Sequence, residues 1–82
     1  MINQGEIITL SNDNEYLCFD TTEMDGKHYI YLITTKEPTE VCFAEQAMVD
    51  GELDICLIGE RKVKMKLASI LQQKAQEVDA GF

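Results

Sequence analysis

The chain has 82 residues, of which 45% are hydrophobic, and a formal net charge of −8 at pH 7. This length allows one small domain, residues 1–82, and the apolar share excludes a disordered chain. The acidic balance makes direct binding to a nucleic-acid backbone unfavourable, because carboxylates and phosphates repel each other.

Five strands are predicted, all between residues 6 and 58. The strongest signal is Asp25-Gly26, the kind of dipeptide that best fits the type I′ turn of a β-hairpin. Asp50-Gly51 repeats this signal further along the chain. Between the two hairpins, Pro38 lacks an amide donor and excludes a central strand. The predicted strands are residues 6–11, 14–23, 27–35, 40–49 and 52–58.

The first hairpin has apolar side chains on both faces. With its two turn residues as the loop, Asp20 lies opposite Tyr31, and Cys18 lies opposite Ile33. Successive side chains of a strand point to opposite faces, so the hairpin sorts into two sets. We expect the aliphatic set to form the core; it contains Leu17, Phe19, Thr21, Ile30 and Leu32.

The opposite face of this hairpin carries all three tyrosines of the chain, Tyr16, Tyr29 and Tyr31. A tyrosine combines an apolar body with a hydroxyl that prefers water, so these residues are candidates for binding a partner protein. The alternative is that they are ordinary residues of the surface or of the edge of the core.

The last segment predicts a helix over about residues 61–78. Residues 62–67 alternate as a strand would, but over a longer window the apolar residues recur with the helical period. Met65 points away from the apolar stripe. Lys74 lies within the stripe, and its ammonium group is expected to reach water or a carboxylate of the sheet. The stripe contains Val63, Leu67, Ile70, Leu71, Ala75 and Val78.

The charges are divided unevenly along the chain. Residues 1–60 hold two lysines against thirteen acidic residues and carry −11, whereas residues 61–82 carry +3. The basic residues crowd the start of the predicted helix, which is the positive end of its dipole. Acids of the same chain, acids of a second copy or a bound anion could compensate for this. The residues concerned are Arg61, Lys62, Lys64 and Lys66.

The order of these elements indicates an α+β domain. Short connections favour pairing of neighbouring strands, so we expect an antiparallel meander of five strands with the C-terminal helix packed on one face.

A group of residues in the first three predicted strands forms a recognisable pattern: Ile8-Thr9-Leu10, Asn14-Glu15-Tyr16, Asp20-Thr21, Glu23, Asp25-Gly26-Lys27, Tyr29 and Leu32. This pattern resembles the YrzB-like family of small acidic proteins from Gram-positive bacteria. The resemblance is strongest over residues 6–32. In that family the final helix opens with acidic residues, whereas residues 59–66 here are basic. The resemblance implies a similar fold and a cytoplasmic location, but no activity, because the family is a domain of unknown function.

The sequence indicates no catalytic, cofactor or metal site. Its single histidine, His28, lies opposite Glu23 across the predicted hairpin, where we expect a surface contact. There is no phosphate-binding or nucleotide-binding motif among the glycines, and the acidic turns do not follow the calcium-loop spacing. The odd number of cysteines and their spacing fit neither a disulfide framework nor a zinc site. We expect Cys18, Cys42 and Cys56 to be small buried residues in a reducing compartment.

Function is therefore predicted at a coarse level. The N-terminus lacks the pattern of a signal peptide, and no segment approaches the roughly 20 apolar residues that span a bilayer, so we expect a cytoplasmic protein. We expect no enzyme but a module that binds another protein or a second copy of the chain. The alternative is an acidic decoy that occupies the basic, nucleic-acid-binding surface of another protein.

Overall fold

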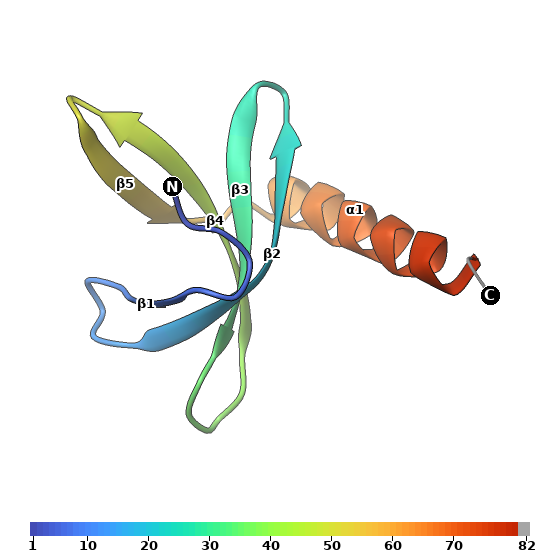
Figure 1. Cartoon of the computed structure of the whole chain (residues 1–82), viewed down its shortest axis with the longest axis horizontal. Coiled ribbons are helices and arrows are strands. Elements are labelled where there is room, and N and C mark those ends of the chain that lie inside the picture. Colours follow the sequence, from blue (N-terminus) through green and yellow to red (C-terminus); the bar gives the residue numbers. More distant parts are fainter. Residues whose placement is uncertain (81–82) are drawn as a thin grey trace.

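The computed structural model describes residues 1–80, with side chains as far as residue 75. Five antiparallel strands form one curled sheet in the order β1-β2-β3-β4-β5, and a single helix follows them (Figure 1). The predicted α+β meander with a C-terminal helix is confirmed. The elements are β1 (Ile7–Thr9), β2 (Glu15–Met24), β3 (Lys27–Thr34), β4 (Val41–Val49), β5 (Glu52–Leu57) and α1 (Arg61–Ala80).

Two of the turns follow directly from their Asp-Gly dipeptides. Asp25 and Gly26 have φ angles of 54° and 76°, and Asp50 and Gly51 have φ angles of 51° and 82°. Positive φ at both loop residues is what a type I′ turn requires, and glycine adopts it without a steric cost from a Cβ atom. These turns fix β2 beside β3, and β4 beside β5.

The predicted register of the β2–β3 hairpin is confirmed near the turn and wrong beyond it. Asp20 lies opposite Tyr31 as predicted, but Cys18 lies opposite Leu32, one residue away from its predicted partner. The shift between Cys18 and Asp20 is a β-bulge with Phe19 as the extra residue. Because side chains alternate along a strand, every residue of β2 before the bulge changes face.

Helix α1 packs across the central part of one face of the sheet, where an aromatic core has formed. The ring of Tyr31 lies between two others, with its centroid 5.9 Å from that of Phe19 and 5.4 Å from that of Phe43. Its hydroxyl donates a buried hydrogen bond of 2.7 Å to the carbonyl oxygen of Leu67, which ties the helix to the sheet. The core contains Tyr29, Tyr31 and Leu67, with Phe19, Met24, Phe43, Ile58, Val63 and Leu71 packed against it.

The face opposite α1 holds a second core, which residues near the N-terminus help to cover. The side-chain amide of the buried Gln46 accepts a hydrogen bond of 2.7 Å from the backbone N–H of Ile2 and donates one of 3.1 Å to the Ile2 carbonyl. These two bonds mimic the pair of backbone hydrogen bonds between neighbouring strands, and they hold Ile2 against the sheet. The core contains Tyr16, Cys18, Ile30, Leu32 and Ala44, with Ile2, Ile8, Leu10, Cys42 and Ile55 packed against it.

The helix follows its predicted apolar stripe. Met65 points away from the sheet and is 62% exposed. The ammonium group of Lys74 donates to the Thr21 carbonyl at 2.6 Å and lies 3.4 Å from a carboxylate oxygen of Asp20, so its predicted reach toward a sheet carboxylate is confirmed. No helix in the described part of the chain has the length and apolar character needed to cross a bilayer. Of the stripe, Val63, Leu67, Ile70 and Leu71 are at least partly buried, Ala75 is exposed, and Val78 lies outside the described side chains.

Candidate functional site

The three candidate tyrosines do not form an exposed face. Tyr16, Tyr29 and Tyr31 expose only 2%, 5% and 0% of their surface. Because of the bulge, Tyr16 lies in the core opposite α1, whereas Tyr29 and Tyr31 lie in the core beneath α1. The expectation of a single tyrosine face is therefore wrong. Partner binding by these residues stays a prediction, and they offer almost no accessible surface for it.

The β4–β5 hairpin, in contrast, leaves apolar side chains exposed on the face opposite α1. Met48 lies directly across from Leu53, and the two are 54% and 37% exposed. Leu57 lies further along β5 on the same face and is 46% exposed. Between them, the partly buried Ile55 joins this surface to the core. We call Met48, Leu53 and Leu57 the apolar row; exposed apolar surface of this kind is typical of interaction sites.

The other face of β5 is acidic. Glu52 and Asp54 alternate with the apolar row along the strand, and Glu45 on β4 lies opposite Cys56. The Cys56 thiol donates a hydrogen bond of 3.6 Å to a carboxylate oxygen of Asp54. The negative charge of Asp54 raises the pKa of this thiol, and Glu45 adds to the effect. One edge strand thus presents an apolar face and an acidic face.

The basic residues at the start of α1 have no carboxylate partner among the described side chains. The ion pairs within residues 1–75 join His28 to Glu23 at 3.8 Å and Lys74 to Asp20 at 3.4 Å. The first of these is the surface contact predicted for the histidine. The acids of the sheet therefore do not compensate for the helix start through direct contact. The unpaired residues, all exposed, are Arg61, Lys62, Lys64 and Lys66.

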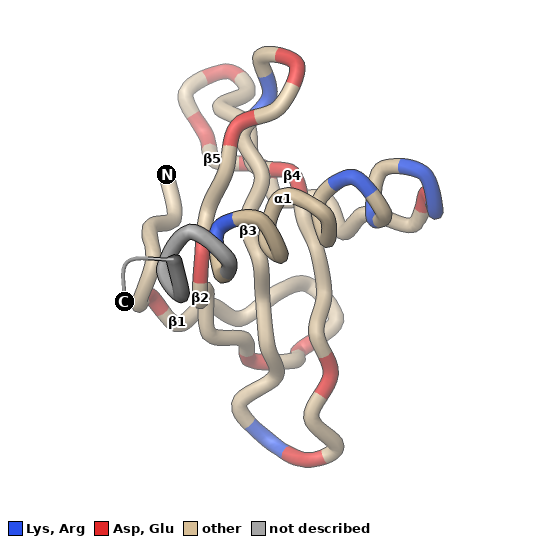
Figure 2. Tube along the Cα trace, turned by 90° about the vertical axis from the view of Figure 1, so that its right-hand side faces the viewer, with Lys and Arg blue, Asp and Glu red and all other residues tan. Residues whose placement is uncertain are grey.

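This basic segment lies close to the end of β5. Lys64 lines a pocket of about 240 Å³ together with Leu57, Ile58 and the first residues of β4. In Figure 2 the basic segments of α1 gather mainly at its start, whereas acidic segments are spread over the strands and turns. The end of β5 is consequently basic and its beginning, at Glu52, is acidic.

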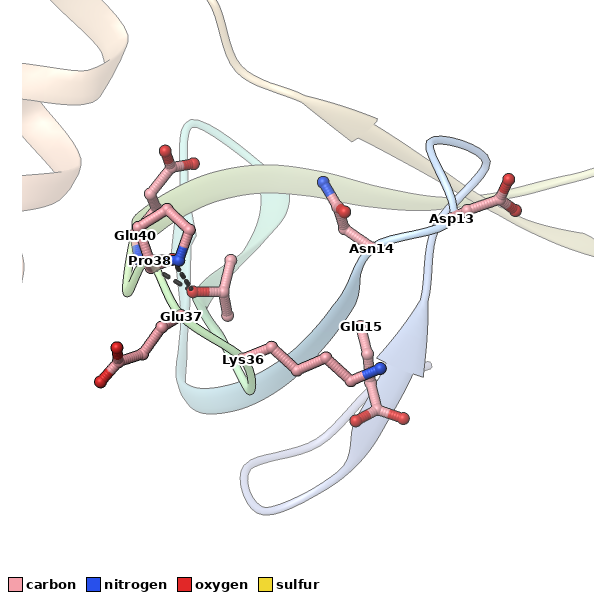
Figure 3. A pocket seen from close by; sticks show the side chains of 8 residues that line it. Asp13, Asn14, Glu15, Lys36, Glu37, Pro38 and Glu40 are labelled. Atoms are coloured by element: carbon pink, nitrogen blue, oxygen red, sulfur yellow. Dashed lines mark hydrogen bonds between the residues drawn. The ribbon is translucent and has the colours of Figure 1, made fainter.

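A second pocket, of about 330 Å³, lies between the loops that precede β2 and β4 (Figure 3). The hydroxyl of Thr34 accepts a hydrogen bond of 2.9 Å from the backbone N–H of Glu40 and donates one of 3.1 Å to the Pro38 carbonyl, which holds the loop in place. The charges around this pocket are mostly negative. Its ionisable lining residues are Asp13, Glu15, Glu37 and Glu40, with the single cation Lys36.

The three cysteines lie in different environments, and each is a free thiol. Cys18 is buried, and burial raises the pKa of its thiol. Cys42 is partly buried, whereas Cys56 is exposed, so the prediction that all three are buried is wrong for Cys56. The physical reason is that Cys56 lies on the acidic face of an edge strand. Within the described residues, no three His, Cys, Asp or Glu side chains are grouped to hold a metal ion.

Comparison of the chain with protein-family models, with curated proteins and with solved structures gives no match. The resemblance to the YrzB-like family therefore stays a prediction.

The apolar row was not singled out from the sequence, although its signal is present. The second Asp-Gly hairpin is the last in the meander, so its final strand has to lie at the edge of the sheet. An edge strand with leucine or isoleucine at alternate positions predicts an exposed apolar row unless another element covers it.

Proposed function

We propose that this chain is a non-enzymatic protein–protein interaction module that binds through the β4–β5 hairpin. The observation that carries the proposal is the apolar row on an edge strand, with Met48, Leu53 and Leu57 all exposed on one face. An edge strand presents unpaired backbone N–H and C=O groups to which another strand can be added. A cytoplasmic location, proposed from the sequence, fits a protein whose three thiols are free.

The surface is well suited to binding because it is held by a rigid support. Ile55 anchors β5 in the core, and the Asp50-Gly51 turn fixes β5 beside β4. The backbone of the row is thus in place before binding, so that only its exposed side chains have to be ordered, which favours affinity.

The proposal is tested by affinity capture from a lysate of the native host after nuclease treatment. The bait is the wild type or the double variant Met48→Ser with Leu53→Ser, and the matched control is Ile7→Ser, which removes an apolar side chain that is 60% exposed on the other edge strand, β1. We expect the double variant to lose bound protein while its circular dichroism stays unchanged. Equal recovery with all three baits, together with unchanged self-association, contradicts the proposal.

A second candidate function is the acidic decoy, and the acidic pocket favours it. Four carboxylates line this pocket against one lysine, so it offers a concentrated negative surface to a basic partner. Binding of this kind weakens steeply with added salt. We expect the triple variant Glu15→Gln, Glu37→Gln and Glu40→Gln to lose a nucleic-acid-binding partner that the wild type retains at low salt. A partner that survives high salt counts against the decoy and in favour of the apolar row.

A further inference from the structure

We propose that the partner of β5 is a second copy of the same chain, which pairs antiparallel with it about a two-fold axis at Ile55. This inference rests on the proposed function, because it names the occupant of the same edge. Figure 1 shows β5 as the outermost strand beyond β4. The other edge, β1, has three residues against six in β5, and a short edge strand offers little for pairing.

The hydrogen-bonding pattern of β5 shows which backbone groups are available. The N–H of Ile58 donates to the carbonyl of Phe43 at 2.8 Å, so these opposed residues form a hydrogen-bonded pair. Hydrogen-bonded and non-hydrogen-bonded pairs alternate along an antiparallel ladder. Leu53, Ile55 and Leu57 therefore direct their N–H and C=O groups away from β4, toward the free side of the strand.

One symmetric register satisfies all of these outward groups. With the axis at Ile55, this residue lies opposite its own copy, and Leu53 lies opposite Leu57 of the other copy. All three residues then occupy hydrogen-bonded positions, and the apolar rows of the two copies meet on one face. Moving the axis to Asp54 would set two carboxylates against each other, and moving it to Cys56 would leave Leu53 beyond the end of the other strand.

The charges of the chain are complementary in the same register. Glu52 at the beginning of β5 comes opposite Ile58 at the end of the other strand. Lys64 lines the pocket formed by Leu57 and Ile58, so it lies at that end. Glu52 points to the acidic face, away from the apolar row, and the helix packs on that same side of the sheet. Each copy thus brings a carboxylate to a basic helix start that has no ion-pair partner among its own described side chains.

A foreign basic strand would satisfy the acidic face of β5 but would place further positive charge beside Lys64 and its basic neighbours. A second copy supplies both signs of charge in the right order. Pairing of this kind would join the two sheets into one continuous sheet.

The first test uses disulfide formation to read the register. In the proposed dimer, position 54 lies opposite Cys56 of the other copy in a non-hydrogen-bonded pair, where Cα atoms are about 4.5 Å apart and a disulfide can form. In a Cys42→Ser background, Asp54→Cys should give a covalent dimer under mild oxidation at least about tenfold faster than the double variant Glu52→Cys with Asp54→Asn, in which the introduced thiol faces Ile58 and the carboxylate beside Cys56 is also absent. Peptide mapping should show the bond between positions 54 and 56 of different copies.

The second test reverses the charges. Sedimentation over a wide range of concentrations should show a monomer–dimer equilibrium for the wild type. Glu52→Lys and Lys64→Glu should each weaken association by about tenfold, because each breaks two symmetric contacts, and the double variant should recover most of the loss. The matched control Lys27→Glu makes the same charge change as Lys64→Glu at the exposed end of β3 and should have no comparable effect.

A wild type that stays monomeric at every concentration overturns the second copy as partner, as does a dimer that is indifferent to the charge reversals and to the position of the introduced thiol. If the monomeric wild type still captures a host protein that Met48→Ser with Leu53→Ser loses, the interaction module stands and only its occupant changes. If neither association nor capture depends on the hairpin, both proposals fail.

Discussion

The two Asp-Gly hairpins of this chain have the same type of turn but differ in burial. In the β2–β3 hairpin, residues 29–32 are all buried, because α1 covers one face and N-terminal residues help to cover the other. In the β4–β5 hairpin, the apolar row remains exposed. The turn determines that two strands pair, whereas the place of the hairpin in the sheet determines whether its side chains stabilise the fold or remain free to bind.

The largest expected difference between the hairpins is in stability. Tyr31→Ala removes a fully buried ring from between Phe19 and Phe43, and we expect it to lower the free energy of unfolding by about 3–5 kcal/mol. Leu53→Ala removes a side chain that is 37% exposed at the edge, and we expect a loss of about 1 kcal/mol or less. Urea denaturation measures both. Similar losses in the free energy of unfolding for the two variants would contradict the difference between the two hairpins.

The alkaline stability of the protein should depend on the same tyrosine. Burial, with a contribution from Asp20, raises the pKa of Tyr31 to about 12 from an ordinary value of 10. Because the folded state holds this proton more tightly than the unfolded state, the stabilisation is complete below pH 10 and is lost as the pH rises toward 12. We expect a loss of roughly 2 kcal/mol between pH 10 and pH 12.

Tyr31→Phe provides the control for this pH dependence. It removes the hydrogen bond to the Leu67 carbonyl at a cost of about 1 kcal/mol at neutral pH. The variant should then show a shallower decline between pH 10 and 12 than the wild type. Parallel stability curves would mean that Tyr31 does not cause the decline.

Gln46 on β4 helps to hold N-terminal residues against the face of the sheet opposite α1. Its side chain makes both hydrogen bonds to the backbone of Ile2, and we expect Gln46→Ala to lower the free energy of unfolding by about 1–2 kcal/mol. Amide hydrogen exchange should become faster at Ile2. Gln73→Ala, at an exposed position of α1, is the matched control and should change stability by less than about 0.5 kcal/mol. Equal effects of the two substitutions would show that the contact to Ile2 adds no stability.

The smallest expected effect concerns the reactivity of the Cys56 thiol on the edge strand β5. Cys56 is accessible, but its raised pKa limits the thiolate that reacts with disulfide reagents. In a Cys42→Ser background, Asp54→Asn should increase the rate of modification several-fold at neutral pH, while Glu40→Gln, which removes a distant charge, should not. If the modification rate of Cys56 is unchanged in Asp54→Asn, this carboxylate is not the main cause of the raised pKa.

Much of the fold could be predicted from short stretches of the sequence. Both Asp-Gly turns, all five strands and the helix follow from local turn chemistry and from the spacing of apolar residues, which act over a few neighbouring residues. The reach of Lys74 toward Asp20 was also predictable, because a long cationic side chain within an apolar stripe has to find a carboxylate or water.

The register beyond Asp20 could not be predicted in the same way. A β-bulge there places the large Phe19 under α1 and the small Cys18 in the opposite core, and this choice depends on what packs against each face. The separation of Tyr16 from the other two tyrosines follows from it. For the same reason, the exposed apolar surface lies on the β4–β5 hairpin and not at the tyrosines.

The sequence by itself therefore determined the order, type and pairing of the elements, because turn conformation and strand alternation are local properties. Only the tertiary structure decided which faces are covered. Coverage by α1, by the N-terminal residues and by neighbouring strands depends on contacts between residues that are distant in the sequence. These contacts bury the tyrosines of the central hairpin and leave the edge of β5 exposed.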